Sequence, residues 1–460
     1  MLGDFYADSD ASIEEGLLAD PFKWSGEPQS LTLNGHSGTH PPRGSNATDP
    51  SCTPLVIDVE PDTDYRLRVV GRTVLSLVKL GIEDHPSLEV IEADGEYTRP
   101  APIDHVQASP GQRFSFRLRT KSAKDVRESG KSLFWVRLES RDRPQELESY
   151  ALLRYRNKHG DDDDDDDDKL PSSLPTTPPV ILPKKTTDYL EYALQPLSEA
   201  VRSAFPTLDE VTRTVRIQVN QALTHGEFVN GTFDGPVVWV QNGEAWQENV
   251  QASTSPAHKP YLIAFYDDED GYAPNHTRAL ANGGFDPVSR AFTAVPGEVL
   301  DVVWESNSGP SGGFDFHPMH VHGEHVYDLG AGNGTYDAAR NERRFPRGFV
   351  PARRDTSILH RYTPKGEAHA TAGWRAWRIR VTEDNVGVWM MHCHIAQHAV
   401  MGMNTVWAFG GREDILEKLG DPPYVKGYLE YGGSAYGDPD EDEPWAEVNE
   451  WFGDRGECEA

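Results

Sequence analysis

Two short stretches of this 460-residue chain concentrate side chains that bind transition metals. The first stretch, residues 317–322, carries three histidines, and the second, residues 389–403, adds three histidines, a cysteine and methionines. The candidate ligands are His317, His320, His322, His392, Cys393, His394, His398 and Met403. Two imidazoles, a thiolate and a weakly bound thioether form the ligand set of blue copper sites, which transfer electrons. The two stretches therefore predict a copper centre.

Side chains alternate between the two faces of a strand, which predicts how the stretches share their ligands. In the second stretch, His392 and His394 would point to one face and Cys393 to the other. If the first stretch is also extended, His320 and His322 share a face. Two such segments side by side would build two sites, and four imidazoles around one centre suit copper, iron, nickel or zinc. The expected sets are His317, Cys393, His398 and Met403 in one site, and His320, His322, His392 and His394 in the other.

Three explanations compete for these residues. An isolated histidine or cysteine is most often a surface or core residue, and zinc sites also combine histidine with cysteine. The helical zinc pattern, in which a glutamate lies between two histidines, is absent from the sequence. Because the ligand types fall at positions consistent with two shared faces, the pattern favours copper over zinc or chance.

The pattern HPxHxHG, followed by HCHIxxHxxxGM, resembles the C-terminal copper-binding signature of the multicopper oxidases. The tail HCHIAQHAVMGMNTVWAFG most resembles the fungal ascorbate-oxidase-like branch, close to laccases. The resemblance implies an oxidase that takes single electrons from a phenol, ascorbate or similar small reductant and reduces O₂ to water. His398 would receive the electron and Cys393 would pass it on. The implied ligands are His317, Cys393, His398 and Met403 for type 1 copper, His320 for type 2 copper, and His322, His392 and His394 for the type 3 pair.

Two departures from the family pattern stand out. Many relatives have a glutamate after HCHI, thought to assist proton delivery, where this chain has Ala396. The N-terminal cupredoxin domain of the family supplies the other half of the trinuclear ligands from its own His-x-His pairs, and no further pair occurs here. His36 and His40 match poorly, and His85 resembles a non-ligand position. The resemblance thus predicts a chain that lacks that domain. The alternative is a chain with type 1 copper only, serving electron transfer or copper binding.

The expected fold is all-β, with tandem cupredoxin-like Greek-key β-sandwiches equivalent to domains two and three of a three-domain oxidase. The predicted limits are 1–160 for the second domain, 161–185 for an acidic and proline-rich linker with eight consecutive aspartates, and 186–460 for the copper-binding domain. Many short apolar runs between Gly and Pro turns support this class. The expected strands include 54–60, 65–70, 74–82, 132–139, 214–220, 236–241, 261–266, 291–295, 299–305, 373–382 and 386–394, with helices at 12–19 and within 189–204.

The roles of residues near the two stretches are predicted less specifically. Glu324 and His325, next to the first stretch, are candidates for hydrogen bonds to the ligand imidazoles, although a surface role is favoured for both. Trp304, Trp374, Trp377 and Trp389 are expected in the core.

Composition limits the partners and the compartment. The net charge of −30 argues against nucleic acid and anionic membranes. No run of about 18 apolar residues is long enough to cross a membrane. Residues 1–15 are too acidic for a signal peptide, so secretion is expected from the family resemblance, with modest support from four glycosylation sequons. Cys52 and Cys458 could pair with each other, but a partner in another segment is preferred for Cys458.

Overall fold

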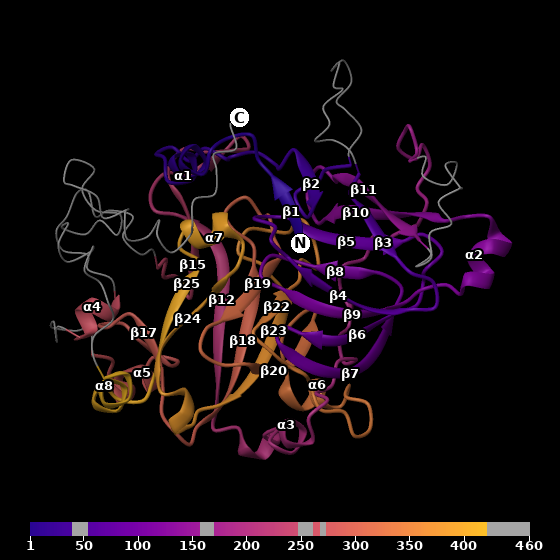
Figure 1. The fold of residues 1–460 in the computed structure, drawn as a ribbon. Helices are drawn as coiled ribbons and strands as arrows, with labels where there is room; N and C mark the ends of the chain where they lie inside the picture. The colour runs from indigo at the N-terminus through magenta and orange to yellow at the C-terminus, as the bar shows by residue number, and fades with distance from the viewer. Residues whose placement is uncertain (39–53, 157–169, 247–260, 267–272, 421–460) are drawn as a thin grey trace, which may run out of the picture. The chain divides into compact units, whose positions relative to one another are not determined.

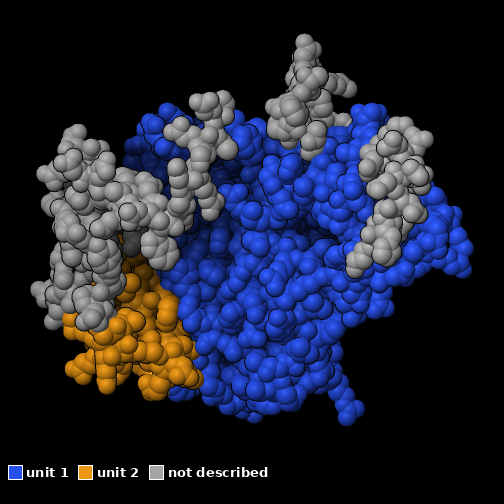
Figure 2. All heavy atoms as spheres, in the orientation of Figure 1, with its two compact units in different colours: residues 1–245, 297–381, 390–405 blue, residues 246–296, 382–389, 406–460 orange. Residues whose placement is uncertain are grey.

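The computed structural model describes residues 1–38, 54–156, 170–246, 261–266 and 273–420 (Figure 1). The aspartate run at 161–168, together with His40, Cys52 and Cys458, lies outside the described residues. The chain divides into two compact units, coloured separately in Figure 2. The first comprises Met1–Ala245, Gly297–Val381 and Met390–Thr405, and the second comprises Trp246–Pro296, Thr382–Trp389 and Val406–Ala460.

The N-terminal segment opens with a small antiparallel sheet, in which β1 (Leu2–Phe5) pairs with β2 (Ser30–Leu33). Helix α1 (Asp10–Leu17) lies between them in sequence, and the Ser9 side chain caps its first turn by accepting the amide hydrogen of Ser12. The helix predicted at 12–19 is confirmed, beginning two residues earlier.

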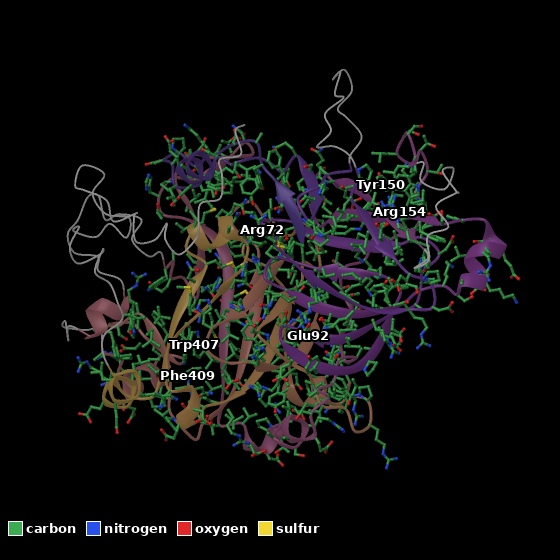
Figure 3. The ribbon with its side chains drawn as sticks, viewed as in Figure 1. Arg72, Glu92, Tyr150, Arg154, Trp407 and Phe409 are labelled. Carbon is green, nitrogen blue, oxygen red and sulfur yellow. The ribbon has the colours of Figure 1, made fainter. Side chains whose placement is uncertain are left out.

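Residues 56–155 form two sheets packed around one hydrophobic core, here called the N-terminal sandwich. The five-stranded sheet runs β3 (Val56–Val59), β11 (Glu148–Tyr155), β10 (Leu133–Arg141), β5 (Leu77–Ile82) and β8 (Val106–Ala108). The four-stranded sheet runs β4 (Asp64–Val70), β9 (Arg113–Arg119), β6 (Leu88–Ala93) and β7 (Glu96–Ile103), and helix α2 (Ala123–Ser129) follows β9. Arg154 of β11 is labelled in Figure 3. It pairs with Asp58 of β3, which lies opposite it on the parallel neighbouring strand. The strands predicted within 54–139 are confirmed.

Strand β9 shows how the sequence builds this sandwich. Phe114, Phe116 and Leu118 are buried, whereas Arg117 and Arg119 between and beyond them are exposed. This period of two places one face on the core, while the other face is exposed at Arg117 and Arg119 and covered at Ser115. Each buried large apolar side chain contributes roughly 1.5–3 kcal/mol.

A six-stranded sheet forms the framework of the rest of the first unit. Its order is β15 (Val237–Gln241), β12 (Arg213–Leu223), β18 (Val299–Asn307), β23 (Thr371–Arg380), β20 (Val326–Gly332) and β21 (Arg353–Arg354). The same unit holds α3 (Glu199–Ser203), η2 (Leu208–Glu210), the hairpin β13 (Phe228–Val229) and β14 (Thr232–Phe233), and α6 (Ala338–Glu342). Trp304 and Trp377 meet edge-to-face within it, 5.6 Å apart. The core positions predicted for Trp304, Trp374 and Trp377 are confirmed, and Trp389 is half-buried.

Two further strands, together with the residues that follow each of them, carry the predicted ligands. β19 (His317–Val321) pairs antiparallel with β22 (Thr356–Leu359) on one side and with residues 391–393 of β24 (Gly387–Cys393) on the other. Helix α7 (Ala396–Val400) follows β24, and β25 (Asn404–Phe409) follows α7.

The second unit has its own apolar core, which includes Tyr261, Phe265 and Ile415. Its elements are α4 (Tyr261–Tyr266), α5 (His276–Leu280), β16 (Phe285–Asp286), β17 (Ala291–Ala294), η3 (Glu383–Asn385), the first part of β24, most of β25, and α8 (Arg412–Leu419). The strand predicted at 261–266 is wrong, because these residues form α4. Tyr261 and Phe265 are buried four residues apart, a helical period that a short apolar run does not reveal by itself.

The segment 187–197 contains turns in place of the additional helix considered there, so α3 is the one helix within 189–204. Asp188, Leu190 and Tyr192 have φ of 64°, 59° and 58°, in the left-handed region. Glu191 between them forms a buried ion pair with Arg375 and lies 3.3 Å from His360 Nε2, and these contacts hold the backbone in place of a helix. Among the described residues, no helix is both long and apolar enough to span a bilayer.

Candidate metal centre

The register of β19 and β24 sorts the predicted ligands into two groups. Met319 lies opposite Cys393, and His320 lies opposite His392. Because neighbouring residues face opposite sides of a sheet, His317 shares a face with Cys393, and His320 shares the other face with His392. The residues that alternation predicted to share a face therefore lie on the same face in the structure.

The first group, here called the His–Cys site, consists of His317, Cys393, His398 and Met403. The Nδ1 atoms of His317 and His398 lie 3.2 Å apart. The Cys393 Sγ atom lies 3.5 Å from His398 Nδ1 and 3.8 Å from His317 Nδ1. All four residues are buried.

These separations fit a single transition-metal ion. Ligand atoms that lie about 2.0–2.3 Å from one ion at angles near 110–120° are roughly 3.3–3.8 Å apart. The measured range of 3.2–3.8 Å matches that condition. Two neutral nitrogens and one sulfur suit copper or zinc, and the burial of the set excludes competing water.

The electrostatics of the His–Cys site follow from its burial. Burial lowers the pKa of His317 to about 4 and holds the pKa of His398 well below its ordinary value, so both rings are neutral and free to bind a metal. Burial also raises the pKa of the Cys393 thiol well above its usual range. A bound cation reverses that preference, because a coordinating thiol loses its proton.

Trp239 of β15 and the segment 401–403 support this site. The Trp239 ring lies 4.8 Å from the ring of His317 and 4.4 Å from that of His398. The Met403 amide donates to the His398 carbonyl at 2.9 Å, and the Cys393 amide donates to the Met403 carbonyl at 3.1 Å. Met403 is therefore tied by the backbone to two of the other candidate ligands.

A carboxylate covers the outer edge of His398. His398 is only 2% exposed, and Asp315 Oδ2 lies 3.7 Å from His398 Nε2, so this edge of the ring is closed to solvent. Arg143 of the N-terminal sandwich donates to Asp315 at 3.1 Å and makes a two-point pair with Glu27 at 2.6 and 2.8 Å. Although burial opposes it, Arg143 helps to lower the pKa of Asp315, so the carboxylate is ionised. A polar molecule that approaches His398 Nε2 would therefore meet the Asp315 carboxylate first.

The second group, here called the imidazole cluster, consists of His320, His322, His392 and His394. His322 Nε2 and His392 Nε2 lie 3.2 Å apart. The ring of His320 lies 5.0, 5.4 and 5.5 Å from the rings of the other three. His322 and His394 are exposed, and His320 and His392 are half-buried. The cluster is therefore open on one side, unlike the His–Cys site.

Hydrogen bonds orient two rings of the imidazole cluster. His320 Nδ1 lies 3.0 Å from the Asp355 carbonyl and 2.9 Å from the Thr356 hydroxyl, and His392 Nδ1 lies 2.8 Å from the Cys393 carbonyl. A carbonyl can only accept, so each Nδ1 carries the hydrogen and each Nε2 presents a lone pair. Burial lowers the pKa of His392 to about 3, aided by the neighbouring imidazoles, so this ring is neutral.

The remaining sequence candidates fall outside the two groups. His85 is buried against Tyr155 and bonded to its hydroxyl at 2.7 Å, which is a structural role. His36 is exposed in a turn. His325 Nε2 bonds to the Asp94 carbonyl at 2.7 Å, and Glu324 pairs with Arg353. These contacts are with the N-terminal sandwich and with β21 rather than with the ligand rings, so the two residues brace the surroundings of the cluster.

Several residues of the site were not predicted from the sequence. Asp315, Trp239 and Arg143 surround the His–Cys site, and Arg113 and Gly111 lie beside the imidazole cluster. Most of them come from segments up to 283 positions away, so spacing in the sequence offered no signal for them. Asp315, two residues before His317, is the exception that proximity could have found.

Solved structures with the same architecture place this fold among known proteins. A laccase from Botrytis aclada aligns with a TM-score of 0.58 at 21% identity, covering 90% of this chain and 64% of that chain. Fet3p, a multicopper oxidase that functions in iron import, aligns with a TM-score of 0.57 at 20% identity, covering 89% and 64%. The cupredoxin-like β-sandwich fold expected from the sequence is thus confirmed, and the chain spans about two thirds of the length of these structures.

Fold and ligand groups together define a β-sandwich metalloprotein with one buried His–Cys site and one open imidazole cluster. Family models described as multicopper oxidase match residues 1–158 and 254–410. The chain is 58% identical to the multicopper oxidase aurL2 of Gibberella zeae, over 99% of this chain and 73% of that protein. It is 36% identical to laccase-like multicopper oxidase 1 of Thermothelomyces thermophilus, over 100% and 73%. The chain belongs to the multicopper oxidase family, and this membership implies copper as its cofactor.

Proposed function

We propose that this protein is an oxidoreductase of the laccase and ascorbate-oxidase type that takes single electrons from a small phenol- or ascorbate-like reductant. One observation carries the proposal. Cys393 lies in the buried His–Cys site, and its sequence neighbours His392 and His394 belong to the imidazole cluster. Copper held by the two groups would supply reversible one-electron chemistry and the reduction of O₂.

The proposed ligand roles follow the two groups. The His–Cys site would hold type 1 copper, and Met403 would be a weak ligand whose identity tunes the potential. The imidazole cluster would hold its share of the type 2 and type 3 coppers. The assignment is His317, Cys393, His398 and Met403 to type 1, His320 to type 2, and His322, His392 and His394 to type 3.

The residues around His398 would receive the donor. Asp315 is an ionised hydrogen-bond acceptor beside the outer nitrogen of His398, and it would bind a hydroxyl of the donor there. Arg143 holds that carboxylate in place. Trp239 packs against the ring of His398 and keeps water from its inner edge. The electron would pass through His398, and the main chain of Cys393 offers a covalent route to both flanking histidines.

The open side of the imidazole cluster suggests where further ligands would enter. His322 and His394 are exposed, so additional imidazoles could approach the same metal ions. We propose that a cupredoxin domain of the kind found at the N-terminus of the family supplies them, and that O₂ reduction depends on it. Within the present chain, the proposed domain limits remain 1–160, 161–185 and 186–460.

We also propose that the protein is secreted and glycosylated, as the family resemblance implies. Asn230 and Asn333 begin Asn-Gly-Thr sequons and are exposed, so a glycan could attach at either position. A shift in mass after removal of N-linked glycans from the natural protein would support this.

Copper content and visible absorbance of the chain test the proposal. About one copper per chain with an intense band near ~600 nm is expected at the His–Cys site, and Cys393→Ser should remove the band because it arises from a thiolate–copper bond. His36→Gln, a change of an exposed histidine outside both groups, should leave the band in place. A chain that binds copper without any band, or a band that survives in Cys393→Ser, would contradict the type 1 assignment.

A further inference from the structure

A turn of the N-terminal sandwich, which contributes none of the proposed ligands, lies directly against the imidazole cluster. Residues 109–112 connect β8 to β9, and Gly111 at its tip has φ of +81°. A Cβ atom at Gly111 would lie 2.4, 2.6 and 2.9 Å from three ring atoms of His394. Such distances are closer than non-bonded carbon contacts allow, so only glycine permits this approach.

The turn itself is firmly held. The Gly111 amide donates to the Gly71 carbonyl at 2.9 Å, and the Gly71 amide donates to the Gln112 carbonyl at 2.8 Å. The side-chain oxygen of Gln112 accepts from both the amide and the hydroxyl of Ser109, at 3.1 and 3.0 Å. Because these bonds tie the tip to the end of β4, Gly111 presents a fixed surface to the ring of His394.

Arg113, the first residue after this turn, reaches a second ring of the cluster through Asp355. Its guanidinium makes a two-point pair with the Asp355 carboxylate, at 2.6 Å to each oxygen. That carboxylate accepts the Thr356 hydroxyl hydrogen at 2.8 Å, which leaves the Thr356 oxygen free to accept from His320 Nδ1 at 2.9 Å. Arg113 thereby helps to set which nitrogen of His320 carries the hydrogen.

A second ion pair joins the N-terminal sandwich to residues 354–355, with the positions of the cation and the anion reversed. Arg354, next to Asp355, donates to the buried Asp94 carboxylate at 2.7 Å, and Asp94 also accepts from the Arg113 amide at 2.8 Å. The N-terminal sandwich thus contributes one cation and one anion, and β21 with the residue after it contributes one of each. Such a reciprocal arrangement resists both sliding and separation of the two segments.

We propose that the 109–113 segment is a positioning element for the imidazole cluster: Gly111 holds the ring of His394, and Arg113, acting through Asp355 and Thr356, reinforces the His320 tautomer that the Asp355 carbonyl also favours. This inference rests on the proposed function in one respect, namely that the cluster binds metal. The N-terminal sandwich then has a role at the metal centre without supplying a ligand. Mutation of a group that orients a metal ligand typically lowers metal affinity by about 10–100-fold.

Gly111→Ala tests the seating of His394, with Gly35→Ala as the matched control. Gly35 has φ of +86°, and nothing lies within 4 Å of a Cβ placed there, so its alanine variant carries the backbone strain alone. In the full metal-free chain with ¹³C-labelled histidines, Gly111→Ala should shift the His394 ring resonances and Gly35→Ala should not. Equal resonances in the two variants would overturn the seating.

Arg113→Lys tests the tautomer, with Arg119→Lys as its control. Both arginines lie on β9 and make two-point pairs with an aspartate, but Arg119 pairs with Asp64 on the exposed face. Lysine keeps the charge and loses the planar fork. The imidazole ¹⁵N shifts of His320 should change in Arg113→Lys only. An unchanged single tautomer in Arg113→Lys would overturn the role of Arg113.

Cu(II) binding to the cluster gives the functional readout, measured by calorimetry in a Cys393→Ser background that removes the thiolate of the other site. Gly111→Ala should weaken binding about 10-fold or more, whereas Gly35→Ala should match the parent. If the Cys393→Ser chain with no further change does not bind Cu(II), the proposed function is rejected. The resonance shifts of the metal-free chain would still test whether the 109–113 segment positions the histidine rings. Shifted resonances with unchanged Cu(II) affinity would overturn the proposed influence on the metal.

Discussion

The Sγ atom of Cys393 lies 3.5 Å from the Nδ1 atom of His398, five residues further along the chain. The close return is possible because β24 ends at Cys393 and α7 begins at Ala396, so one helical turn carries His398 back over the strand end. The backbone bonds of Met403 to both residues complete the loop. One continuous segment therefore supplies three of the four candidate ligands, and β19 needs to add only His317.

Copper removal is expected to destabilise the chain. A ligand that binds only the folded state at a free concentration 100 times its Kd adds about 2.7 kcal/mol to the free energy of unfolding. Chelation of copper should remove this increment, and the midpoint of thermal unfolding should fall. Unfolding scans of the copper-loaded and the chelated protein, at the same protein concentration, provide the measurement.

His317→Gln serves as the specific variant for that experiment. It removes one ligand of the His–Cys site, so added copper should stabilise it less than the parent. The exposed variant His36→Gln should respond like the parent. A stabilisation by copper that is identical in all three proteins would place the bound copper outside the His–Cys site.

The sequence predicted the division of the ligands because that division depends on local geometry alone. His320 and His392 share a face through the period of two in each strand, and the registered pair β19–β24 then brings them together. Periodicity failed at Tyr261–Tyr266, where a six-residue apolar run fits a strand and a helix equally well. The contacts that decided between them are tertiary and leave no local trace.

The surroundings of the ligands could not be predicted for a related reason. Arg143 holds the Asp315 carboxylate beside His398, and Gly111 packs against the ring of His394. Each pair joins segments that are far apart in the sequence. A single sequence specifies which side chains exist but not which distant ones meet. Glycine at 111 is an unremarkable turn residue until the ring that lies on it is known.

Asp315→Asn is expected to slow electron uptake from donors that carry a hydroxyl. An amide is a weaker acceptor than an ionised carboxylate, and the loss of a charge-assisted hydrogen bond of about 1.5–3 kcal/mol corresponds to roughly a 10-fold or larger loss of rate. Anaerobic bleaching of the blue band by a phenol would measure this step without any requirement for O₂ reduction.

Ferrocyanide, which has no hydroxyl, is the matched donor for the Asp315 variant. Its rate should not fall, because it cannot donate a hydrogen bond to position 315. Asp64→Asn, a change of an exposed carboxylate that pairs with Arg119, should leave both rates unaltered. A fall in rate of the same size with both donors would instead indicate a general change in the His–Cys site.

Trp239→Ala should destabilise the His–Cys site through lost packing. The Trp239 side chain is buried against two candidate ligand rings, and truncation of a buried tryptophan costs about 3–5 kcal/mol. Denaturant unfolding of the metal-free chain should show this loss. Trp24→Ala, a truncation of a tryptophan that is 42% exposed, should have a much smaller effect, and equal losses would contradict the packing role.

Glu191→Gln is expected to destabilise the first unit by about 3–5 kcal/mol near neutral pH, because it leaves buried Arg375 without one of its charge partners. Burial by itself raises the pKa of Glu191, but Arg375 and His360 outweigh it and lower the pKa to about 2. The unfolded carboxyl has a pKa near 4.3. The folded state therefore binds fewer protons than the unfolded state between these values, and the stability from Glu191 is present above the upper value and declines as pH falls toward the lower one.

The difference in unfolding free energy between the parent and Glu191→Gln should accordingly be constant at pH 6–7 and shrink as the pH is lowered from about 5 toward about 2. Urea unfolding of both proteins across that range gives the difference directly, and common acid effects on other carboxyls cancel in it. Glu199→Gln, on the exposed first turn of α3, should show almost no difference from the parent at any of these pH values. A difference for Glu191→Gln that stays constant down to the lowest pH at which both proteins fold would show that Glu191 keeps the same pKa when the chain unfolds, and would contradict a charge pair formed by folding.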